Sequence, residues 1–482
     1  RWKNGVMAGL FAAYALLAEM IFGVFLALLS LIYLWVVARR RCTWQLVARL
    51  ALLGLVALVV WSPVGLPILR ELLTGGYELE GWGESLKLSV DLLGFLTPTA
   101  LHPLWGKEWV QELRAVTAGT ARFSDVNTLF LGFGTLLLAG VGWLRFGRRL
   151  AAWLWSALLF ALLALGPLLQ VNGRSRFNLD GLEVTYPLPF ALLHYLPLVR
   201  GNRVPNRFSV VLMLALAVLA AYGVVALSRF LARRLGQRAN ATPLYRGLYG
   251  GLAALLLFEH AALPLPLTDA RVPAIYTRLA QEEGDFALLQ LPLGWRNSFG
   301  MLGAEDTRVQ YYQTVHGRPM LGGNISRNPP FKMDYFARLP LFRALIELES
   351  YREPDAETDA AARAQAAALM GLYDVRYVVM LPPVPGRVPY ADTWAPTQAY
   401  AREVLPLAAE PFYQGEGLTI YRVEPPPPTD LFQVDFGEEA AYPYQAEGWS
   451  RPETDIFGVT ANWATEERAR VFLRLVGGRS QR

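Results

Sequence analysis

Residues 208–227, with the sequence FSVVLMLALAVLAAYGVVAL, form a run of twenty residues without a charged side chain. At about 1.5 Å rise per residue, a helix of this length crosses a hydrocarbon layer of roughly 30 Å. Arg229, Arg233, Arg234 and Arg238 follow the run, and no acid accompanies them. Short arginine-rich loops stay on the cytoplasmic side of a membrane. The run therefore predicts a transmembrane helix whose C-terminal end faces the cytoplasm.

Other apolar runs lie before Leu267, and the composition becomes more polar after it. Residues 5–38 are too long for one span, so we expect a short or interfacial helix over 5–18, Glu19 at the junction, and a span over 20–37. The remaining predicted spans are 50–66, ended near Pro63 and Pro67, then 126–144, 150–169 and 247–267. Residues 1–267 are thus predicted to form a polytopic α-helical membrane domain with about six spans.

The distribution of charge predicts how this domain is oriented. The three short loops between predicted spans hold twelve arginines and neither Asp nor Glu, whereas the long loops 70–125 and 170–207 hold ten bases and ten acids. The positive-inside rule places the short loops in the cytoplasm, and the long loops and everything after Leu267 outside the cytoplasmic (inner) membrane. The net charge of +5 is therefore attributed to orientation in a lipid bilayer, and we expect no nucleic-acid partner.

Residues 268–424 alternate short apolar strands with helical segments, which predicts an extracytoplasmic α/β domain. Strands are expected over 286–293, 375–381 and 417–423, and helices over 307–315, 331–349 and 357–370. Four prolines at 425–428 predict an extended linker. The remaining residues resemble the short strands of a partial β-sandwich, so 425–482 is treated as a third part.

Ionisable residues within apolar runs are candidates for function, because they are costly at membrane depth. Glu19 interrupts the first run, and Glu259 and His260 lie in the last. The alternative is that Glu19 lies at a helix junction near the interface, and that Glu259 and His260 are close enough to the outer end to meet water.

The strongest ligand candidates precede the run at 208–227. Arg200, Asn202, Arg203 and Arg207 stand in LPLVRGNRVPNRF, on the outer side of the predicted topology. Arginine makes planar, bidentate contacts with phosphate oxygens, so a lipid-linked phosphate could bind there. The alternative is an interfacial anchor for the helix, or pairing with acids of the other outer loop.

Two histidines, His102 and His194, occupy the two outer loops beside aromatic residues. No further ligand at metal spacing accompanies either one, so no metal site and no cofactor are predicted, although a divalent metal is left open. In the polar segment 311–329, His316, Arg318, Asn324 and Arg327 could form a site, but a structural loop is preferred. The single cysteine, Cys42, permits no intramolecular disulfide.

Several segments together resemble bacterial multi-pass membrane proteins of the YfhO-like and GT-C glycosyltransferase-like kind. They are GFLTPTALHPLWG, LPLVRGNRVPNRF, LLLFEHAALPLPL, FALLQLPLGW, QTVHGRPMLGGNISR, DVRYVVML and GWSRPETDIFGVTANWA. The resemblance covers nearly the whole chain, as the C-terminal two-thirds of such a protein. It implies transfer of a sugar from a polyprenyl-phosphate donor to a glycan or lipid acceptor outside the membrane. The catalytic carboxylate of GT-C enzymes lies in a first outer loop, which we expect upstream of Arg1, so no catalytic residue is carried over.

Two other classes of function stay open. A non-catalytic membrane protein for polysaccharide or cell-envelope assembly would bind glycan without turnover. A secondary transporter is less favoured, because the spans contain few charges and show no paired broken helices.

Overall fold

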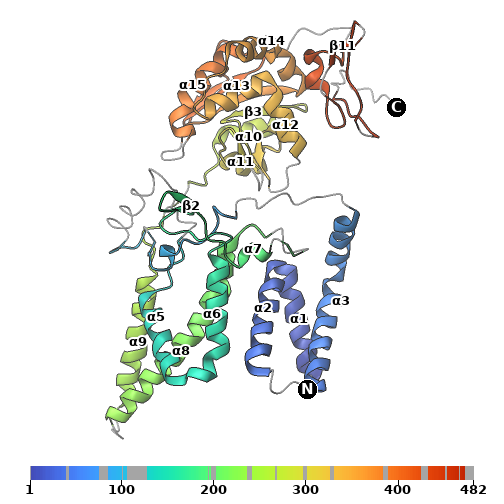
Figure 1. Ribbon diagram of the computed structural model, residues 1–482. Coiled ribbons are helices and arrows are strands. Elements are labelled where there is room, and N and C mark those ends of the chain that lie inside the picture. Colours follow the sequence, from blue (N-terminus) through green and yellow to red (C-terminus); the bar gives the residue numbers. More distant parts are fainter. Residues whose placement is uncertain are drawn as a thin grey trace. The chain divides into compact units, whose positions relative to one another are not determined.

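The computed structural model describes most of the chain, in two compact units, Arg1–Leu267 (unit 1) and Thr268–Arg482 (unit 2) (Figure 1). The described residues are 2–38, 43–74, 85–99, 101–105, 128–193, 195–196, 202–235, 241–265, 267, 269–296, 301–325, 330–383, 389–424, 433–450, 453–456, 458–465 and 467–472.

Unit 1 is mainly helical. Its α-helices are α1 (Trp2–Ala18), α2 (Ile21–Tyr33), α3 (Trp44–Thr74), α5 (Phe133–Phe146), α6 (Ala151–Ala164), α7 (Phe190–Leu193), α8 (Ser209–Leu235) and α9 (Ala241–Glu259). The short helical turns are η1 (Leu34–Ala38), η2 (Leu93–Phe95), η4 (Gly147–Leu150) and η5 (Pro205–Phe208). Strands β1 (Phe177–Leu179) and β2 (Leu182–Val184) form an antiparallel hairpin.

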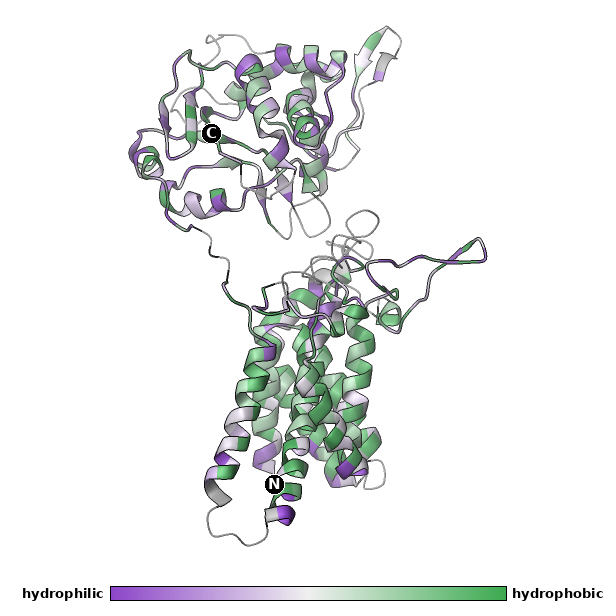
Figure 2. Cartoon of the chain, turned by 90° about the vertical axis from the view of Figure 1, so that its left-hand side faces the viewer, coloured by the Kyte–Doolittle hydropathy of each residue, from purple (hydrophilic) through white to green (hydrophobic). Residues whose placement is uncertain are grey.

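Three helical segments in the described part of the chain are long and apolar enough to cross a membrane. They are Trp44–Arg70, Phe133–Ala164 and Pro205–Arg234, and Ile21–Val36 is apolar but shorter. The second segment contains α5, η4 and α6, and Figure 1 shows α5 and α6 as an antiparallel pair. Apolar residues cover these helices in Figure 2, and many of them are exposed, such as Leu144 at 86%. A surface of this kind suits a lipid environment.

Helix α3 differs from the prediction because it continues through Pro63 and Pro67 to Thr74. A proline lacks the N–H that would bond to the carbonyl four residues earlier, here that of Val59. The Ser62 hydroxyl donates to the Val59 carbonyl at 2.8 Å instead. Side chains of this type satisfy the carbonyls freed by proline in membrane helices, so the helix is not interrupted.

Two predicted spans are also displaced. The predicted span 126–144 begins as a helix only at Phe133, because Gly132 has a φ of +81° and marks the start of α5. The predicted span 247–267 is replaced by α9, which begins at Ala241 and ends at Glu259. Pro264 prevents the helix from extending through the rest of the predicted span, since proline cannot continue a helix.

Close packing holds α5 against α8. A Cβ atom added to Gly142 would lie 2.3 Å from the Leu219 carbonyl oxygen, and one added to Gly223 would lie 2.0 Å from that of Leu138. The two backbones therefore touch where both helices carry glycine, as is common between membrane helices. Helix α2 contacts α6 and η5 through aromatic side chains. The Phe25 ring of α2 lies between Phe160 of α6 and Phe208 of η5, with centroid distances of 6.0 and 4.9 Å.

Unit 2 is an α/β unit. Its helices are α10 (Ala274–Gln281), α11 (Arg308–His316), α12 (Pro330–Arg338), α13 (Pro340–Glu349), α14 (Ala356–Leu372), α15 (Tyr390–Val404) and the 3-10 helix η6 (Glu439–Tyr444). Its strands are β3 (Ala287–Leu291), β4 (Trp295–Arg296), β5 (Met301–Leu302), β6 (Met320–Leu321), β7 (Gly323–Asn324), β8 (Val375–Met380), β9 (Tyr413–Gly415), β10 (Leu418–Arg422), β11 (Glu453–Ile456) and β12 (Val459–Ala461).

The main sheet has the order β6-β3-β8-β10-β9, with β3 parallel to β6 and β8 and the other pairs antiparallel. Its two faces bury separate apolar clusters. Leu289 and Leu291 of β3 face a cluster that includes residues of α13, α14 and α15, whereas Leu288 faces one with residues of α10 and α11. A smaller sheet, β5-β4-β7, lies beyond the end of β3.

The predicted strands are present as β3, β8 and β10, and two of the predicted helices as α11 and α14, but the predicted helix 331–349 is divided at Leu339 into α12 and α13. Helix α15 was not predicted, because Pro396 obscures its pattern. The predicted β-sandwich is not seen in the described residues of 425–482. These form the β11–β12 hairpin and two isolated bridges, Gln445 with Val471 and Trp449 with Ala464. Prolines 425–428 lie outside the described residues.

Candidate functional site

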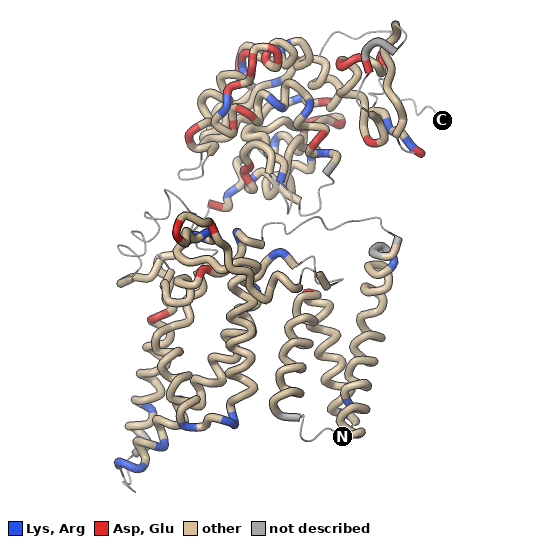
Figure 3. The backbone as a smooth tube through the Cα atoms, in the orientation of Figure 1, with Lys and Arg blue, Asp and Glu red and all other residues tan. Residues whose placement is uncertain are grey.

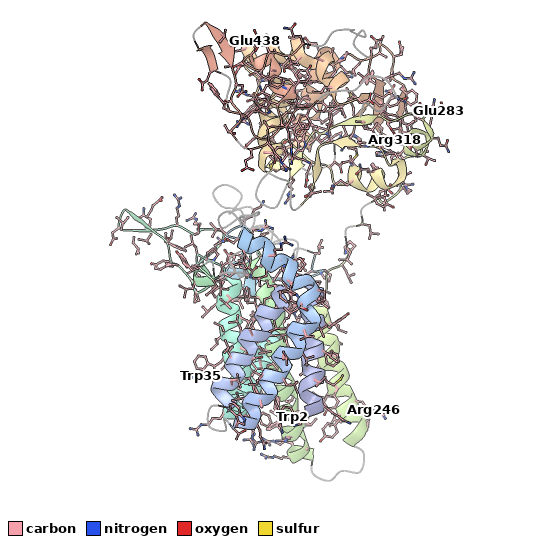
Figure 4. The ribbon with its side chains drawn as sticks, turned by 90° about the vertical axis from the view of Figure 1, so that its right-hand side faces the viewer. Trp2, Trp35, Arg246, Glu283, Arg318 and Glu438 are labelled. Carbon is pink, nitrogen blue, oxygen red and sulfur yellow. The ribbon has the colours of Figure 1, made fainter. Side chains whose placement is uncertain are left out.

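The two ends of the unit 1 helices differ in charge (Figure 3). One end, called the basic end, carries Arg145, Arg148, Arg149, Arg229, Arg233, Arg234 and Arg246. Figure 4 shows Arg246 and Trp2 at this end. The opposite end, called the far end, includes the α1–α2 junction and the starts of α5 and α8. Most of the candidate residues that the sequence identified lie at the far end.

Arg207 and Glu19 form an ion pair at the far end. Glu19 lies between the end of α1 and the start of α2, and Arg207 lies in η5 just before α8. The Arg207 guanidinium donates to Glu19 Oε1, and the two side chains are 49% and 41% exposed. The aromatic contact of Phe208 with Phe25 fixes η5 beside α2. The structure thus joins two candidates that are 188 residues apart.

The segment before α8 brings further polar groups to the same place. Arg203 is half-buried, and the Asn206 N–H donates to the Leu88 carbonyl at 3.2 Å. Asn202 Oδ1 accepts from the Val204 N–H at 3.4 Å, and Asn202 Nδ2 is buried without a hydrogen-bond partner in the described part of the chain. Arg200, the fourth member of the predicted cluster, lies outside the described residues.

Glu259 binds the first turn of α5. Its carboxylate accepts from the Gly134 N–H at 2.8 Å, and from the Thr135 N–H and hydroxyl at 3.2 and 3.3 Å. The free N–H groups at a helix start favour an anion. The side chain is only 2% exposed, so it is not accessible to a ligand. Its geometry indicates a structural role, which is to hold the end of α9 on α5.

The two histidines near Glu259 are also used within the protein. His260 Nδ1 contacts the Leu256 carbonyl at 3.0 Å and lies 4.0 Å from Glu259 Oε1. His102 Nδ1 accepts from the Leu104 and Trp105 N–H groups at 3.2 Å, so Nε2 carries the proton and donates to the Phe258 carbonyl at 2.9 Å. The imidazole stacks on Trp105, with centroids 4.5 Å apart. The structure brings His102, His260 and Glu259 together, and His194 lies outside the described residues.

Asp91 is a buried group that the sequence analysis missed. It is 0% exposed, and its carboxylate accepts from the N–H groups of Leu93, Asn172 and Gly173 at 2.9, 3.0 and 2.7 Å. Burial raises the pKa of this carboxyl, while the hydrogen bonds oppose the rise. The Asn-Gly dipeptide at 172–173 marks a turn, with φ values of +50° and +74°. Asp91 therefore connects the first long loop to the second. The Asn-Gly dipeptide predicts the turn but not its contact with Asp91.

In unit 2, the described candidates of the polar segment, His316, Arg318 and Asn324, make contacts within the protein. The Arg318 guanidinium donates to the carbonyls of Leu279, Ala280, Glu282 and Gly284, around the C-terminal end of α10. Figure 4 shows Arg318 with Glu283 on this side of unit 2. His316 is 4% exposed, and Asn324 Nδ2 donates to Glu305 at 3.3 Å. Arg327 lies outside the described residues.

Glu349 is the second buried carboxyl that the sequence analysis missed. It ends α13, is fully buried, and accepts from the N–H groups of Leu293 at 2.5 Å and Ala304 at 2.7 Å. Burial raises the pKa of Glu349 well above its ordinary value. The carboxyl joins α13 to the segment after β3, so it stabilises the fold rather than a site. No sequence signal separates it from the exposed acids of a helix.

The described residues contain no group of three or more His, Cys, Asp or Glu side chains that could hold a metal ion. Glu19 and Arg207 thus form a partly exposed ion pair at the far end, where Arg174, Arg176, Asp180 and Glu183 around the β1–β2 hairpin are also exposed. In comparisons with known proteins, no family model, no curated protein and no solved structure matches the chain.

Proposed function

We propose that the chain is a multi-pass protein of the cytoplasmic membrane that transfers a sugar from a polyprenyl-phosphate donor at the outer face. Three membrane-length helical segments support the membrane setting. The arginines at the basic end support a cytoplasmic position for that end. The far end, and unit 2 after α9, would then face outside.

The observation that carries the proposal is the pair of Arg207 with Glu19. A half-exposed guanidinium at the far end already holds a carboxylate, and its planar donors match phosphate oxygens equally well. Arg203 and Asn202 lie in the same segment, within five residues of Arg207. A lipid-linked phosphate in the outer leaflet would replace Glu19 on Arg207.

When the phosphate replaces Glu19 on Arg207, the Glu19 carboxylate becomes free to act as a base. In the transfer, the acceptor oxygen bonds to the anomeric carbon, and the bond from that carbon to the phosphate oxygen breaks. The phosphate leaves with the electron pair, its charge stabilised by Arg203 and Arg207. A base must take the proton of the acceptor hydroxyl. Asp91 and Glu259 are buried and bonded to backbone N–H groups, so Glu19 is the accessible carboxylate at the cluster among the described residues.

The experiment measures binding of undecaprenyl phosphate by the full chain in nanodiscs. We expect Arg207→Gln to weaken binding at least about tenfold, because a charge-assisted hydrogen bond contributes about 1.5–3 kcal/mol. The matched control is Arg176→Gln, since Arg176 is 74% exposed and pairs with Glu183 across the β1–β2 hairpin. Equal affinity of wild type and Arg207→Gln would contradict the proposed site.

A second variant separates a transferase from a non-catalytic assembly protein. Glu19→Gln frees Arg207 from its carboxylate, so undecaprenyl phosphate should bind at least as tightly as in the wild type. If the protein is a transferase, release of undecaprenyl phosphate from a polyprenyl-phosphate sugar should be lost in the same variant. Binding without release by the wild type would favour the glycan-binding or assembly function instead.

A further inference from the structure

Unit 2 contains a groove that no part of the proposed transfer reaction uses. It has a volume of about 540 Å³ and lies between α11, the β6–β7 segment, α12, the end of α14 and Phe472. Volumes of this size are typical of small-molecule sites. We infer that this groove binds an acidic oligosaccharide, and the inference does not rest on the proposed transferase activity.

The floor of the groove is aromatic. Trp295 and Tyr335, 4% and 7% exposed, line it together with Phe336 and Tyr373. Trp295 stacks on Phe336 with centroids 4.3 Å apart, and Phe472, which is 41% exposed, meets Tyr335 edge-on at 5.5 Å. Aromatic faces carry partial negative charge. They attract the C–H groups on one side of a sugar ring, which carry partial positive charge.

The edge of the groove offers polar groups in fixed positions. Gln310 Nε2 donates to the Asn324 carbonyl at 2.9 Å, and Gln313 Nε2 donates to the Arg318 carbonyl at 3.0 Å. These bonds orient the two amides. No described residue donates a hydrogen bond to Oε1 of Gln310 or of Gln313. Sugar hydroxyl groups donate readily to such oxygens. A purely apolar ligand would leave them without partners.

Charge selects the class of sugar. The described residues that line the groove include Lys332, which is exposed, and no Asp or Glu. The Lys332 ammonium would attract a carboxylate on the sugar. The combination of aromatic faces, oriented carbonyl oxygens and one cation therefore favours an oligosaccharide that contains uronic acid.

The test titrates the full chain in nanodiscs with tetragalacturonate and with maltotetraose, by isothermal titration calorimetry. Nanodiscs avoid sugar-based detergents, which would compete for the groove. We expect tetragalacturonate to bind more tightly than maltotetraose, and Lys332→Gln to remove most of that preference. Phe472→Ala should weaken binding of both probes about fivefold, because it removes an exposed aromatic ring from the groove.

The matched control is Trp394→Ala, because Trp394 of α15 is 37% exposed and does not line the groove. It should leave both affinities unchanged. Absence of binding, equal affinity for the two probes, or equal loss in Phe472→Ala and Trp394→Ala would overturn the inference. Undecaprenyl phosphate binding measured on the same preparations shows separately whether the Arg207 site is intact.

Discussion

At the scale of single residues, three buried carboxyl groups of this chain are held by backbone N–H groups. Asp91, Glu259 and Glu349 each accept two or more N–H groups from a distant segment. Removing such a partner leaves buried N–H groups unsatisfied, which costs about 1–3 kcal/mol each. The ion pair between Glu19 and Arg207 differs because both side chains are partly exposed, so a ligand can replace one partner.

His316 makes the stability of unit 2 depend on pH. Burial, and secondarily the charge of Arg318, lowers the pKa of His316 from 6.5 to about 4. The folded state therefore favours the neutral imidazole. The stabilisation that neutral His316 gives the folded state is fully present above pH 6.5. It is lost as the pH falls from 6.5 towards 4, because the unfolded state then binds a proton that the folded state does not. Hydrogen exchange in α10 and α11, corrected for its intrinsic pH dependence, measures this loss.

The control for this prediction is His316→Gln, whose amide oxygen can still accept the Arg318 N–H that now bonds to Nδ1 at 3.0 Å. The variant should lose less stability between pH 6.5 and 4.5 than the wild type. Glu349 titrates in both proteins, so its effect cancels in the comparison. Identical pH dependence in the two proteins would show that His316 is not the group responsible.

At the scale of helices, the contact between α5 and α8 depends on glycine. Gly223→Ala should destabilise unit 1, because the new Cβ would lie 2.0 Å from the Leu138 carbonyl oxygen. We expect a loss of about 1–3 kcal/mol, as for other overpacked sites. Gly140→Ala in α5 is the control, since an added Cβ there meets no atom within 4 Å. Thermal unfolding of both variants in nanodiscs tests this, and equal melting temperatures would contradict the packing.

The sequence was sufficient to find most helices, because apolar composition and periodicity are local properties. It did not give their ends. The start of α5 depends on Gly132 and on Glu259, which lies 125 residues from Gly134. Helix α3 continues past Pro63 because the Ser62 hydroxyl bonds to Val59, a detail of geometry that the presence of proline conceals.

The candidate site was predictable in part. Arg207, Arg203 and Glu19 were identified as separate candidates, since each is a charged residue next to an apolar run. The pairing of Arg207 with Glu19 was not predictable, because it depends on how α2 packs beside α8. The groove in unit 2 was missed for the same reason. Its aromatic residues come from segments between 295 and 472 and show no common motif.

At the scale of the whole molecule, the account requires that the basic end of unit 1 and unit 2 lie on opposite sides of a membrane. The described helices α3, α5, α6, α8 and α9 alternate in direction, and most of their basic residues gather at one end, with Arg70 of α3 at the other (Figure 3). The proposed lipid-phosphate site at Arg207 requires this arrangement, because only then would the far end meet the outer leaflet. The sidedness of the chain is therefore its central claim.

The measurement that tests this claim most directly is labelling by a membrane-impermeant maleimide in intact spheroplasts. The native Cys42, the only cysteine in the sequence, follows Arg39, Arg40 and Arg41 and precedes α3 along the chain. It should react only after the membrane is permeabilised. In a Cys42→Ser background, Ala360→Cys on exposed α14 of unit 2 should react in intact spheroplasts. Labelling of both positions from the same side would contradict the account.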